Sequence, residues 1–268
     1  MNQGYPSSQD PNPPTPEYGR QAIPQGPPAP RQVSIKTPSV APTVSYIIMG
    51  LTIFVYLLQM ASQYMLGNDW LALLGLKVNS LIVSGQVWRL FTPMLLHGSI
   101  LHIGFNMYAL YLFGPGLERH FGHWRFLALY VLSGFAGNVM SFLFASAPSL
   151  GSSTAIFGLL GAEGVFLYQN RELFGKNAQR ALTNIVLVGV INLAIGLSPG
   201  IDNWGHVGGL LGGTLFAWFG GPMLKVEGIF PALSIVDQRG TDEVVRTGLL
   251  TGLLFALLAA AAIYLRGG

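Results

Sequence analysis

Seven apolar segments account for most of the chain, and each is long enough to cross the roughly 30 Å hydrocarbon core of a bilayer as a helix. They lie near residues 44–66, 99–117, 125–146, 152–169, 181–198, 204–224 and 246–265. Only 9% of the residues are charged, whereas a soluble domain carries roughly 25%. The 35 glycines fit the same environment, because small residues let membrane helices approach closely. The sequence therefore predicts an all-α, polytopic membrane protein.

Three further stretches complete the predicted organisation. Residues 1–40 are rich in Pro, Gln, Gly and Ser, so we expect a disordered tail rather than a folded domain or a signal peptide. Residues 67–98 are too interrupted to span a membrane and are expected to lie at its interface. We expect a core over residues 41–224 that includes this interfacial loop. A linker and the seventh span follow over residues 225–268.

The distribution of Lys and Arg predicts an orientation, because cytoplasmic loops carry an excess of both. With the N-terminus inside, the outer side holds three of the 14 basic residues, Lys77, Arg89 and Arg266. The other eleven fall on the inner side: Arg20, Arg31, Lys36, Arg119, Arg125, Arg171, Lys176, Arg180, Lys225, Arg239 and Arg246. We therefore expect a multi-pass protein of the cell membrane with a cytoplasmic N-terminus. The fourth and sixth spans then both begin at the outer face.

Composition also argues against several classes of function. The chain has no cysteine, which excludes disulfides, thiolate catalysis and cysteine metal sites. Its histidines show no ligand spacing with carboxylates at one depth, so we expect neither a metal nor another cofactor. The net charge of +3 comes from basic residues dispersed beside apolar segments. We therefore expect the lipid bilayer, and no nucleic acid, among the partners.

Four polar side chains are predicted to converge on one layer near the outer face. Polar groups inside a membrane are costly and are functional candidates by default. Ser153 and His206 each lie in the first turn of a span that begins outside, so their depths agree within roughly 5 Å at 1.5 Å per residue. His102 and Asn106 lie one turn apart, on one face, in the outer part of the second span.

This layer has the parts of a serine hydrolase. A serine hydroxyl needs a base, and His206 is the buried base at the depth of Ser153 on a neighbouring span. A developing oxyanion needs donors, which His102, Asn106 and the backbone N–H of Ser153 can supply. Each residue also has a structural alternative: a helix-capping serine, a buried structural histidine, and interhelical polar contacts for His102 and Asn106.

A family resemblance is carried by five motifs. They are Trp88–Arg89, H-x4-H-x3-N at His97, His102 and Asn106, E-x3-G at Glu118 and Gly122, G-x-S ending at Ser153, and G-H-V-G-G-L-L-G-G over residues 205–213. In order and spacing they resemble the rhomboid intramembrane serine proteases over about residues 44–222. The resemblance implies a rhomboid-like six-helix core, here followed by a seventh, C-terminal transmembrane helix.

The resemblance also implies roles for individual residues. Ser153 resembles the family's nucleophile and His206 its general base, while His102 and Asn106 resemble the side chains that stabilise the oxyanion. Phe157 takes the place of an aromatic residue packed against the catalytic imidazole. The stretch 67–98 resembles the family's first loop, with Trp88–Arg89 as a structural anchor. Glu118 is expected to tie the inner end of its helix to Arg119 or to backbone.

Several nearby polar residues are expected to have structural roles. Asp202 invites a catalytic triad, but its place four residues before His206 favours a helix cap. His97 is expected to be a structural hydrogen-bonding residue, and Ser152 a cap or a solvent-facing group. Thr154 departs from the family pattern, which usually has Gly there, and a β-branched residue restricts backbone freedom and close approach. We expect an altered contact beside Ser153 and a tuned rather than inactive site.

Glu163 is predicted to lie roughly 15 Å deeper than Ser153. A lone carboxylate at that depth needs a hydrogen bond or a proton, and Asn184 or Asn192 on the fifth span are the expected partners. A structural network is favoured over a catalytic role.

The predicted function is hydrolysis of peptide bonds in transmembrane substrates near the outer membrane boundary, by a Ser153–His206 dyad. One alternative is a catalytically inactive rhomboid-like protein that binds or escorts membrane-protein clients. Another is a transporter or channel, which would show broken helices at mid-membrane and internal symmetry. The sequence shows neither feature clearly.

Overall fold

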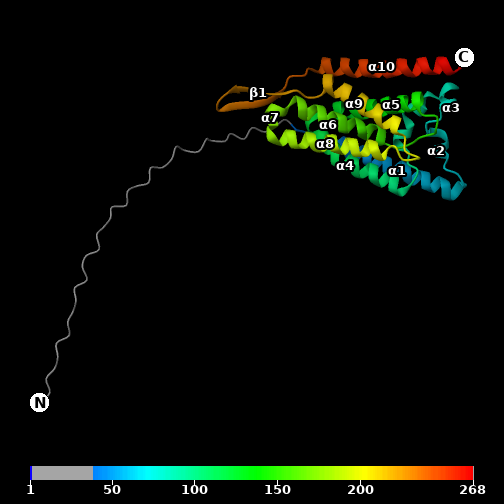
Figure 1. Cartoon of the computed structure of the whole chain (residues 1–268), viewed down its shortest axis with the longest axis horizontal. Helices are drawn as coiled ribbons and strands as arrows, with labels where there is room; N and C mark the ends of the chain where they lie inside the picture. Colours follow the sequence, from blue (N-terminus) through cyan, green and yellow to red (C-terminus); the bar gives the residue numbers. More distant parts are fainter. Residues whose placement is uncertain (2–38, 268) are drawn as a thin grey trace. The chain divides into compact units, whose positions relative to one another are not determined.

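The computed structural model describes residue 1 and residues 39–267 (Figure 1). The predicted disordered tail, residues 1–40, therefore lies almost entirely outside the described residues. Within residues 39–267 the α-helices are α1 Thr43–Leu66, α2 Trp70–Gly75, α3 Asn79–Val83, α4 Ile100–Phe121, α5 His123–Phe144, α6 Ser153–Gln169, α7 Arg171–Phe174, α8 Lys176–Ile195, α9 Asn203–Gly220 and α10 Thr241–Gly267. Two short 3-10 helices, η1 Val87–Leu90 and η2 Thr92–Leu95, precede α4, and strands β1 Leu224–Ile229 and β2 Ala232–Asp237 precede α10.

Each predicted apolar segment forms one long helix, namely α1, α4, α5, α6, α8, α9 and α10. Figure 1 shows these helices running side by side in a bundle, with α2 and α3 at one end and β1 at the other. Among the described residues, α1, α5, α8 and α10 are long and apolar enough to cross a membrane. The helices α4, α6 and α9, which carry the predicted site residues, do not meet both the length and the hydropathy expected of a membrane-spanning helix. The helix α6, for example, has only 17 residues. The six-plus-one count of spans therefore stays a prediction, while a mostly helical membrane protein is confirmed.

The helices differ sharply in burial, and the difference identifies the centre of the bundle. In α5, 67% of the apolar stretch is buried, but in α8 and α10 the values are 11% and 22%. The outer helices instead present large apolar side chains outward, such as Leu249, Leu253 and Leu257 of α10. Soluble monomers rarely expose apolar patches of this extent. The outward-facing surface is therefore suited to lipid.

Glycines bring α9 into backbone contact with α6. A Cβ at Gly209 would lie 1.8 Å from the carbonyl oxygen of Thr154, and one at Gly213 would lie 2.2 Å from that of Gly158. No larger residue fits at either position without separating the helices. The predicted packing of the Gly205, Gly209 and Gly213 face against the fourth apolar segment is confirmed, and it is the contact that determines the site geometry below.

The interfacial stretch 67–98 is held together by Trp88 and Arg89. The Arg89 guanidinium donates to the carbonyl oxygens of Leu76 at 2.7 Å and Leu73 at 2.8 Å. The Trp88 indole donates to the carbonyl oxygen of Leu74 at 3.1 Å. These three carbonyls belong to α2 and its C-terminal end, so both side chains tie η1 to α2. The predicted structural role of this pair is confirmed.

Glu118 caps the beginning of α1. Its carboxylate accepts hydrogen bonds from the backbone N–H groups of Val44 and Ser45, both at 2.7 Å, and from the Ser45 hydroxyl at 2.6 Å. The imidazole of His123 lies 2.6 Å from the same carboxylate. The first N–H groups of a helix have no intrahelical acceptor, so Glu118 satisfies two of them. The predicted tie to backbone is confirmed, but the partner is α1 and not Arg119.

The all-α prediction is wrong for residues 224–237, which form an antiparallel hairpin. Each six-residue strand contains β-branched residues that favour extended backbone, among them Val226 and Ile235. Gly228 has a φ of +103°, which a continuous helix does not allow. Asp237 fixes the base of the hairpin to the bundle through a 2.7 Å ion pair with Arg125 of α5.

Candidate active site

Ser153 and His206, predicted to share one depth, are in contact. Ser153 is the first residue of α6, and His206 lies in the first turn of α9. The distance from His206 Nε2 to Ser153 Oγ is 3.0 Å. In the tautomer that carries its proton on Nδ1, Nε2 accepts a hydrogen bond from the Ser153 hydroxyl. We refer to the end of the bundle where α5 ends and α6 and α9 begin as the Ser153 end.

The His206 ring is held by an aromatic stack and not by a carboxylate. Phe157, one turn after Ser153, stacks on the imidazole with ring centroids 4.2 Å apart and an interplanar angle of 12°. Among the described residues, His206 Nδ1 has no hydrogen-bond partner. The Asp202 carboxylate accepts instead from the backbone N–H of Gly205 at 3.0 Å and from the Ser141 hydroxyl. Asp202 is therefore the predicted cap of α9, and the geometry contains a pair and not a triad.

Thr154 occupies a space lined by glycines. It is 5% exposed, and a Cβ at Gly137 of α5 would lie 2.6 Å from the Thr154 Cβ. A Cβ at Gly205 of α9 would lie 3.0 Å from the Thr154 methyl carbon. The β-branched side chain thus fills volume that glycines on two neighbouring helices leave open. The expected altered contact is present, but the neighbouring helices accommodate it.

His102 lies beside the serine and Asn106 lies one turn further away. A Cβ at Gly151 would be 2.7 Å from His102 Nε2 and 3.7 Å from Ser153 Oγ, so His102 and Ser153 flank the same glycine. The Asn106 amide, by contrast, donates to the carbonyl oxygen of His102 in its own helix at 3.0 Å. The structure therefore brings His102, His206 and Ser153 together, while the Asn106 amide is engaged within α4.

His97 and Ser152 form a buried pair beside the site. Ser152 is fully buried, and its Oγ lies 3.3 Å from His97 Nε2. Ser152 occupies the expected N-cap position of α6, but its side chain makes no capping hydrogen bond. The expectation of a solvent-facing Ser152 is wrong, because His97, between η2 and α4, covers it. The structural role expected for His97 is confirmed. Burial, aided by the nearby His102, lowers the pKa of His97 to about 4, so this imidazole is neutral at pH 7.

Glu163 does not form the predicted network. The Asn192 amide donates to the Val188 carbonyl of its own helix at 2.8 Å, and the ion pairs within residues 39–267 join Glu118 to His123 and Asp237 to Arg125. The helix α6 meets α8 through Gly164, whose Cβ position lies 3.7 Å from Ile185. The hydrogen bonds and ion pairs found within residues 39–267 do not join Glu163 to either expected asparagine.

Two residues at the Ser153 end were missed as candidates. The distribution of basic residues predicts Lys77 only as a charge on the outer side, yet the structure buries it fully. Ser141 lies inside an apolar run, and its hydroxyl joins Ser149 to Asp202. A single lysine in a mostly apolar stretch is a weak signal, and nothing in the sequence pairs it with residues more than sixty positions away.

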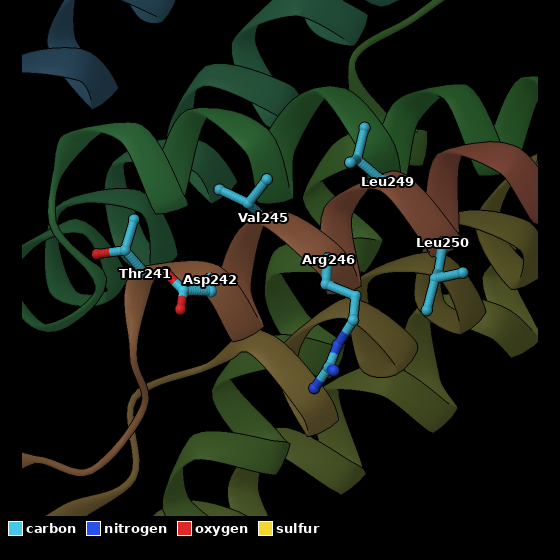
Figure 2. Close-up of a pocket in the computed structure, with 6 residues that line it drawn as sticks. All are labelled: Thr241, Asp242, Val245, Arg246, Leu249 and Leu250. Carbon is cyan, nitrogen blue, oxygen red and sulfur yellow. The ribbon is translucent and has the colours of Figure 1, made fainter.

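A depression on the surface of α10 lies away from this pair (Figure 2). The residues that line it all belong to the first part of α10: Thr241, Asp242, Val245, Arg246, Leu249 and Leu250. At its other terminus the helix approaches the Ser153 end, where Arg266 donates to the carbonyl oxygens of Phe142 and Leu143. The depression also lacks a nucleophile paired with a base, so it is not a candidate catalytic centre.

Comparison with known proteins agrees with the geometry. A model of the Rhomboid domain matches residues 84–223. The chain is 41% identical over 177 residues to Rhomboid protease GluP of Bacillus subtilis, covering 66% of this chain and 34% of that protein. It is 37% identical over 156 residues to the chloroplastic RHOMBOID-like protein 9 of Arabidopsis thaliana, covering 58% of this chain and 36% of the relative.

The mitochondrial RHOMBOID-like protein 6 of Arabidopsis thaliana is 42% identical over 134 residues, which cover 49% of this chain and 43% of the relative. The chain thus spans less than half the length of these three curated relatives. The matched region contains η1, the α4–α6 helices and α9, which supply every residue of the contact described above. Because this region is more than half of the 268-residue chain, the multi-pass membrane protein belongs to the rhomboid family.

Proposed function

We propose that the protein is an intramembrane serine endopeptidase that hydrolyses peptide bonds of transmembrane protein substrates. The observation that carries the proposal is the 3.0 Å contact between His206 Nε2 and Ser153 Oγ, with the imidazole stacked on Phe157. The similarity to a bacterial rhomboid protease supports the same reaction class. No cofactor is required, because nucleophile, base and oxyanion donors are all protein groups.

In the proposed reaction, His206 Nε2 takes the proton from the Ser153 hydroxyl as Oγ attacks the scissile carbonyl carbon. The tetrahedral intermediate carries an oxyanion beside the start of α6, where the first backbone N–H groups have no intrahelical acceptor. The Ser153 N–H and His102 are the nearest donors, and Asn106 joins them after rotating its amide away from the His102 carbonyl. His206 then protonates the leaving amine, and an acyl-enzyme forms. Water, activated by the same imidazole, releases the acyl group and regenerates Ser153.

We further propose that the seven long helices span the bilayer as a six-helix core plus α10. The basic residues on the flanks favour a cytoplasmic N-terminus in the cell membrane, which places the Ser153 end near the outer boundary. Water can reach a shallow site of this kind, and transmembrane substrates would be cleaved near that boundary. Residues 67–98, tied together by Arg89 and Trp88, would lie at the interface beside the site.

The test is cleavage of a model transmembrane substrate by the purified protein, together with fluorophosphonate labelling of Ser153. Ser153→Ala and His206→Ala are each expected to lower kcat/KM by at least about 10⁴-fold, the order seen when triad members are removed from serine proteases. Ser152→Ala is the matched control, because it removes the neighbouring hydroxyl, which pairs with His97, and leaves the Ser153–His206 contact in place. It should keep most of the activity.

Unchanged cleavage in both alanine variants would refute the Ser153–His206 mechanism. Absence of both cleavage and labelling in the wild type would favour the alternative, an inactive rhomboid-like protein that binds or escorts membrane-protein clients. Loss of activity in Ser152→Ala, with activity retained in Ser153→Ala, would show that Ser152 and not Ser153 is the nucleophile.

A further inference from the structure

Lys77 places a buried ammonium group at the Ser153 end. The residue is fully buried, and Nζ donates to the carbonyl oxygens of Ala147 at 2.8 Å and Ala145 at 3.1 Å. A longer contact of 3.5 Å reaches the carbonyl oxygen of Ser141. An ammonium group has three N–H donors and no acceptor. Each of the three donors therefore has a carbonyl partner at or just beyond the end of α5.

The carbonyls of Ala145 and Ala147 lie beyond Phe144, the last residue of α5, whereas the Ser141 carbonyl also accepts from the Ala145 N–H at 2.8 Å. The last carbonyls of a helix lack intrahelical donors, and an unpaired carbonyl in a membrane is costly. Arg266 of α10 donates to Phe142 and Leu143 at 2.6 and 2.8 Å. Asn79 of α3 donates to the Ala145 carbonyl at 2.9 Å. Two cations thus meet the negative end of the α5 dipole, one from α10 and one from the interfacial stretch. Of these two, only Lys77 is fully buried.

Lys77 also holds the segment that leads into Ser153. Its backbone N–H donates to the Ser149 carbonyl at 2.9 Å, and its carbonyl accepts from the Ser149 N–H at 3.1 Å. The Gly151 N–H then donates to the Pro93 carbonyl at 2.9 Å. Segment 145–151 is therefore fixed from the side of the interfacial stretch by both the main chain and the side chain of Lys77. Ser153 follows this segment by two residues.

A second connection leads from the same place to His206. Ser141, whose carbonyl faces the Lys77 ammonium, donates its hydroxyl to the Asp202 carboxylate. Asp202 caps α9 through the Gly205 N–H at 3.0 Å, and Gly205 directly precedes His206. The end of α5 thus contacts both the segment before the nucleophile and the cap of the helix that carries the base.

Lys77 keeps its charge under ordinary conditions. Burial lowers its pKa from 10.5 to about 8, against the attraction of Asp202 and with a smaller contribution from the repulsion of Arg266. At pH 7 the protonated form therefore prevails, and its hydrogen bonds to the carbonyls are charge-assisted.

We propose that Lys77 is a positioning residue that sets the distance between Ser153 Oγ and His206 Nε2 by clamping the end of α5 to both site-bearing segments. The kinetic test of this inference rests on the proposed protease function. The clamp, meaning the hydrogen bonds of Lys77 to segment 141–149, can be tested without any activity through amide hydrogen exchange. Lys77 is buried and bonds to main-chain groups of segment 141–149, not to Ser153 or His206. Its removal should therefore impair the chemical step and leave substrate binding nearly unchanged.

The test compares Lys77→Met, which keeps the apolar stem and removes the ammonium, with the wild-type protein. We expect kcat for a transmembrane substrate to fall at least about tenfold while KM stays within about twofold, because only the alignment of the pair is lost. Amide hydrogen exchange of segment 145–151, measured in a Ser153→Ala background, should accelerate about tenfold or more. The matched control is Lys225→Met, which removes an exposed lysine of β1 and should change neither quantity.

The proposal is overturned if kcat of Lys77→Met stays within about twofold of the wild type, or if segment 145–151 exchanges no faster. If the wild-type protein cleaves no substrate, the proposed function is refuted and not the role of Lys77. The hydrogen-exchange measurement alone then tests whether Lys77 holds segment 145–151. If Lys77→Met does not fold, Ser141→Ala replaces it, because that variant removes the hydroxyl that joins Asp202 and Ser149. It should lower kcat by several-fold and accelerate exchange in the first turn of α9, and unchanged values for both would refute the clamp.

Discussion

At the scale of single residues, Thr154 shows how a local departure from a family pattern is accommodated by its neighbours. The sequence has a restrictive β-branched residue next to Ser153. In the structure its methyl and Cβ fill the space over Gly205 and Gly137, so the side chain is buried core and not an obstruction. Its hydroxyl has no hydrogen-bond partner among the described residues, and the apolar part therefore makes the stabilising contribution.

Thr154→Gly is expected to destabilise the protein without activating it. The free energy of unfolding should fall by about 1–2 kcal/mol, mostly from the lost buried contacts, because Thr is better than Gly in helix propensity by only roughly a few tenths of a kcal/mol. The measurement is thermal unfolding in detergent together with the cleavage rate. Thr183→Gly, at an exposed position of α8, is the control, because it loses helix propensity but no buried contact. A several-fold rise in activity in Thr154→Gly would instead mean that the native site is impaired.

At the scale of elements, the distance between α6 and α9 determines whether the site exists. The two helices begin at the same end of the bundle, and each contributes one member of the Ser153–His206 pair. Their backbones touch at Gly209 and Gly213, where a methyl group would lie about 2 Å from a carbonyl oxygen of α6. Close packing of α6 and α9 and formation of the pair therefore have the same cause.

Gly209→Ala is expected to separate the helices and to abolish the pair. The new methyl group would meet the Thr154 carbonyl oxygen, which belongs to the backbone and cannot rotate away. Overpacking of this kind costs about 1–3 kcal/mol or more, and fluorophosphonate labelling of Ser153 should be lost. Gly116→Ala in α4 is the control, because nothing lies within 4 Å of its Cβ position. That variant should be as stable as the wild type or more so, and equal melting temperatures for both variants would contradict this account.

At the scale of the whole molecule, the hairpin lies at the opposite end of the helix bundle from α2 and α3, which adjoin the Ser153 end (Figure 1). The helices between these ends present apolar side chains outward. The hairpin carries Ile229 and Phe230 at its exposed tip and is tied to α5 by the Arg125–Asp237 ion pair. The Ser153 end and the hairpin therefore lie on opposite sides of the apolar region. An orientation in the membrane can be assigned by locating either of them.

Single cysteines report this orientation directly, because the chain contains no cysteine of its own. Ser198→Cys lies in the connection between α8 and α9, and Phe230→Cys at the hairpin tip, which is 61% exposed. In intact cells a membrane-impermeant maleimide should label Ser198→Cys, and Phe230→Cys should react only after permeabilisation. The reverse pattern would overturn the orientation inferred from the basic residues and leave the site geometry untouched.

Much of this organisation follows from the order of residues alone. Apolar length predicts all seven long helices, and the glycine spacing at 205, 209 and 213 predicts the face that α9 presents to α6. Depth along two helices that start on the same side pairs Ser153 with His206. These inferences succeed because they depend on helix periodicity and on the cost of polar groups in lipid, both of which are local properties.

The tertiary structure decided what depends on contacts between distant segments. It placed Ser152 against His97, engaged the Asn106 amide within α4, and left Glu163 without the predicted partner. It also formed the hairpin after α9 and brought Lys77 to the end of α5, more than sixty residues away in sequence. Hydrogen-bond partners of buried polar groups are chosen by whichever acceptors the packing brings within about 3 Å. These hydrogen-bond partners therefore depend on how the helices and loops pack, and no local pattern in the sequence specifies them.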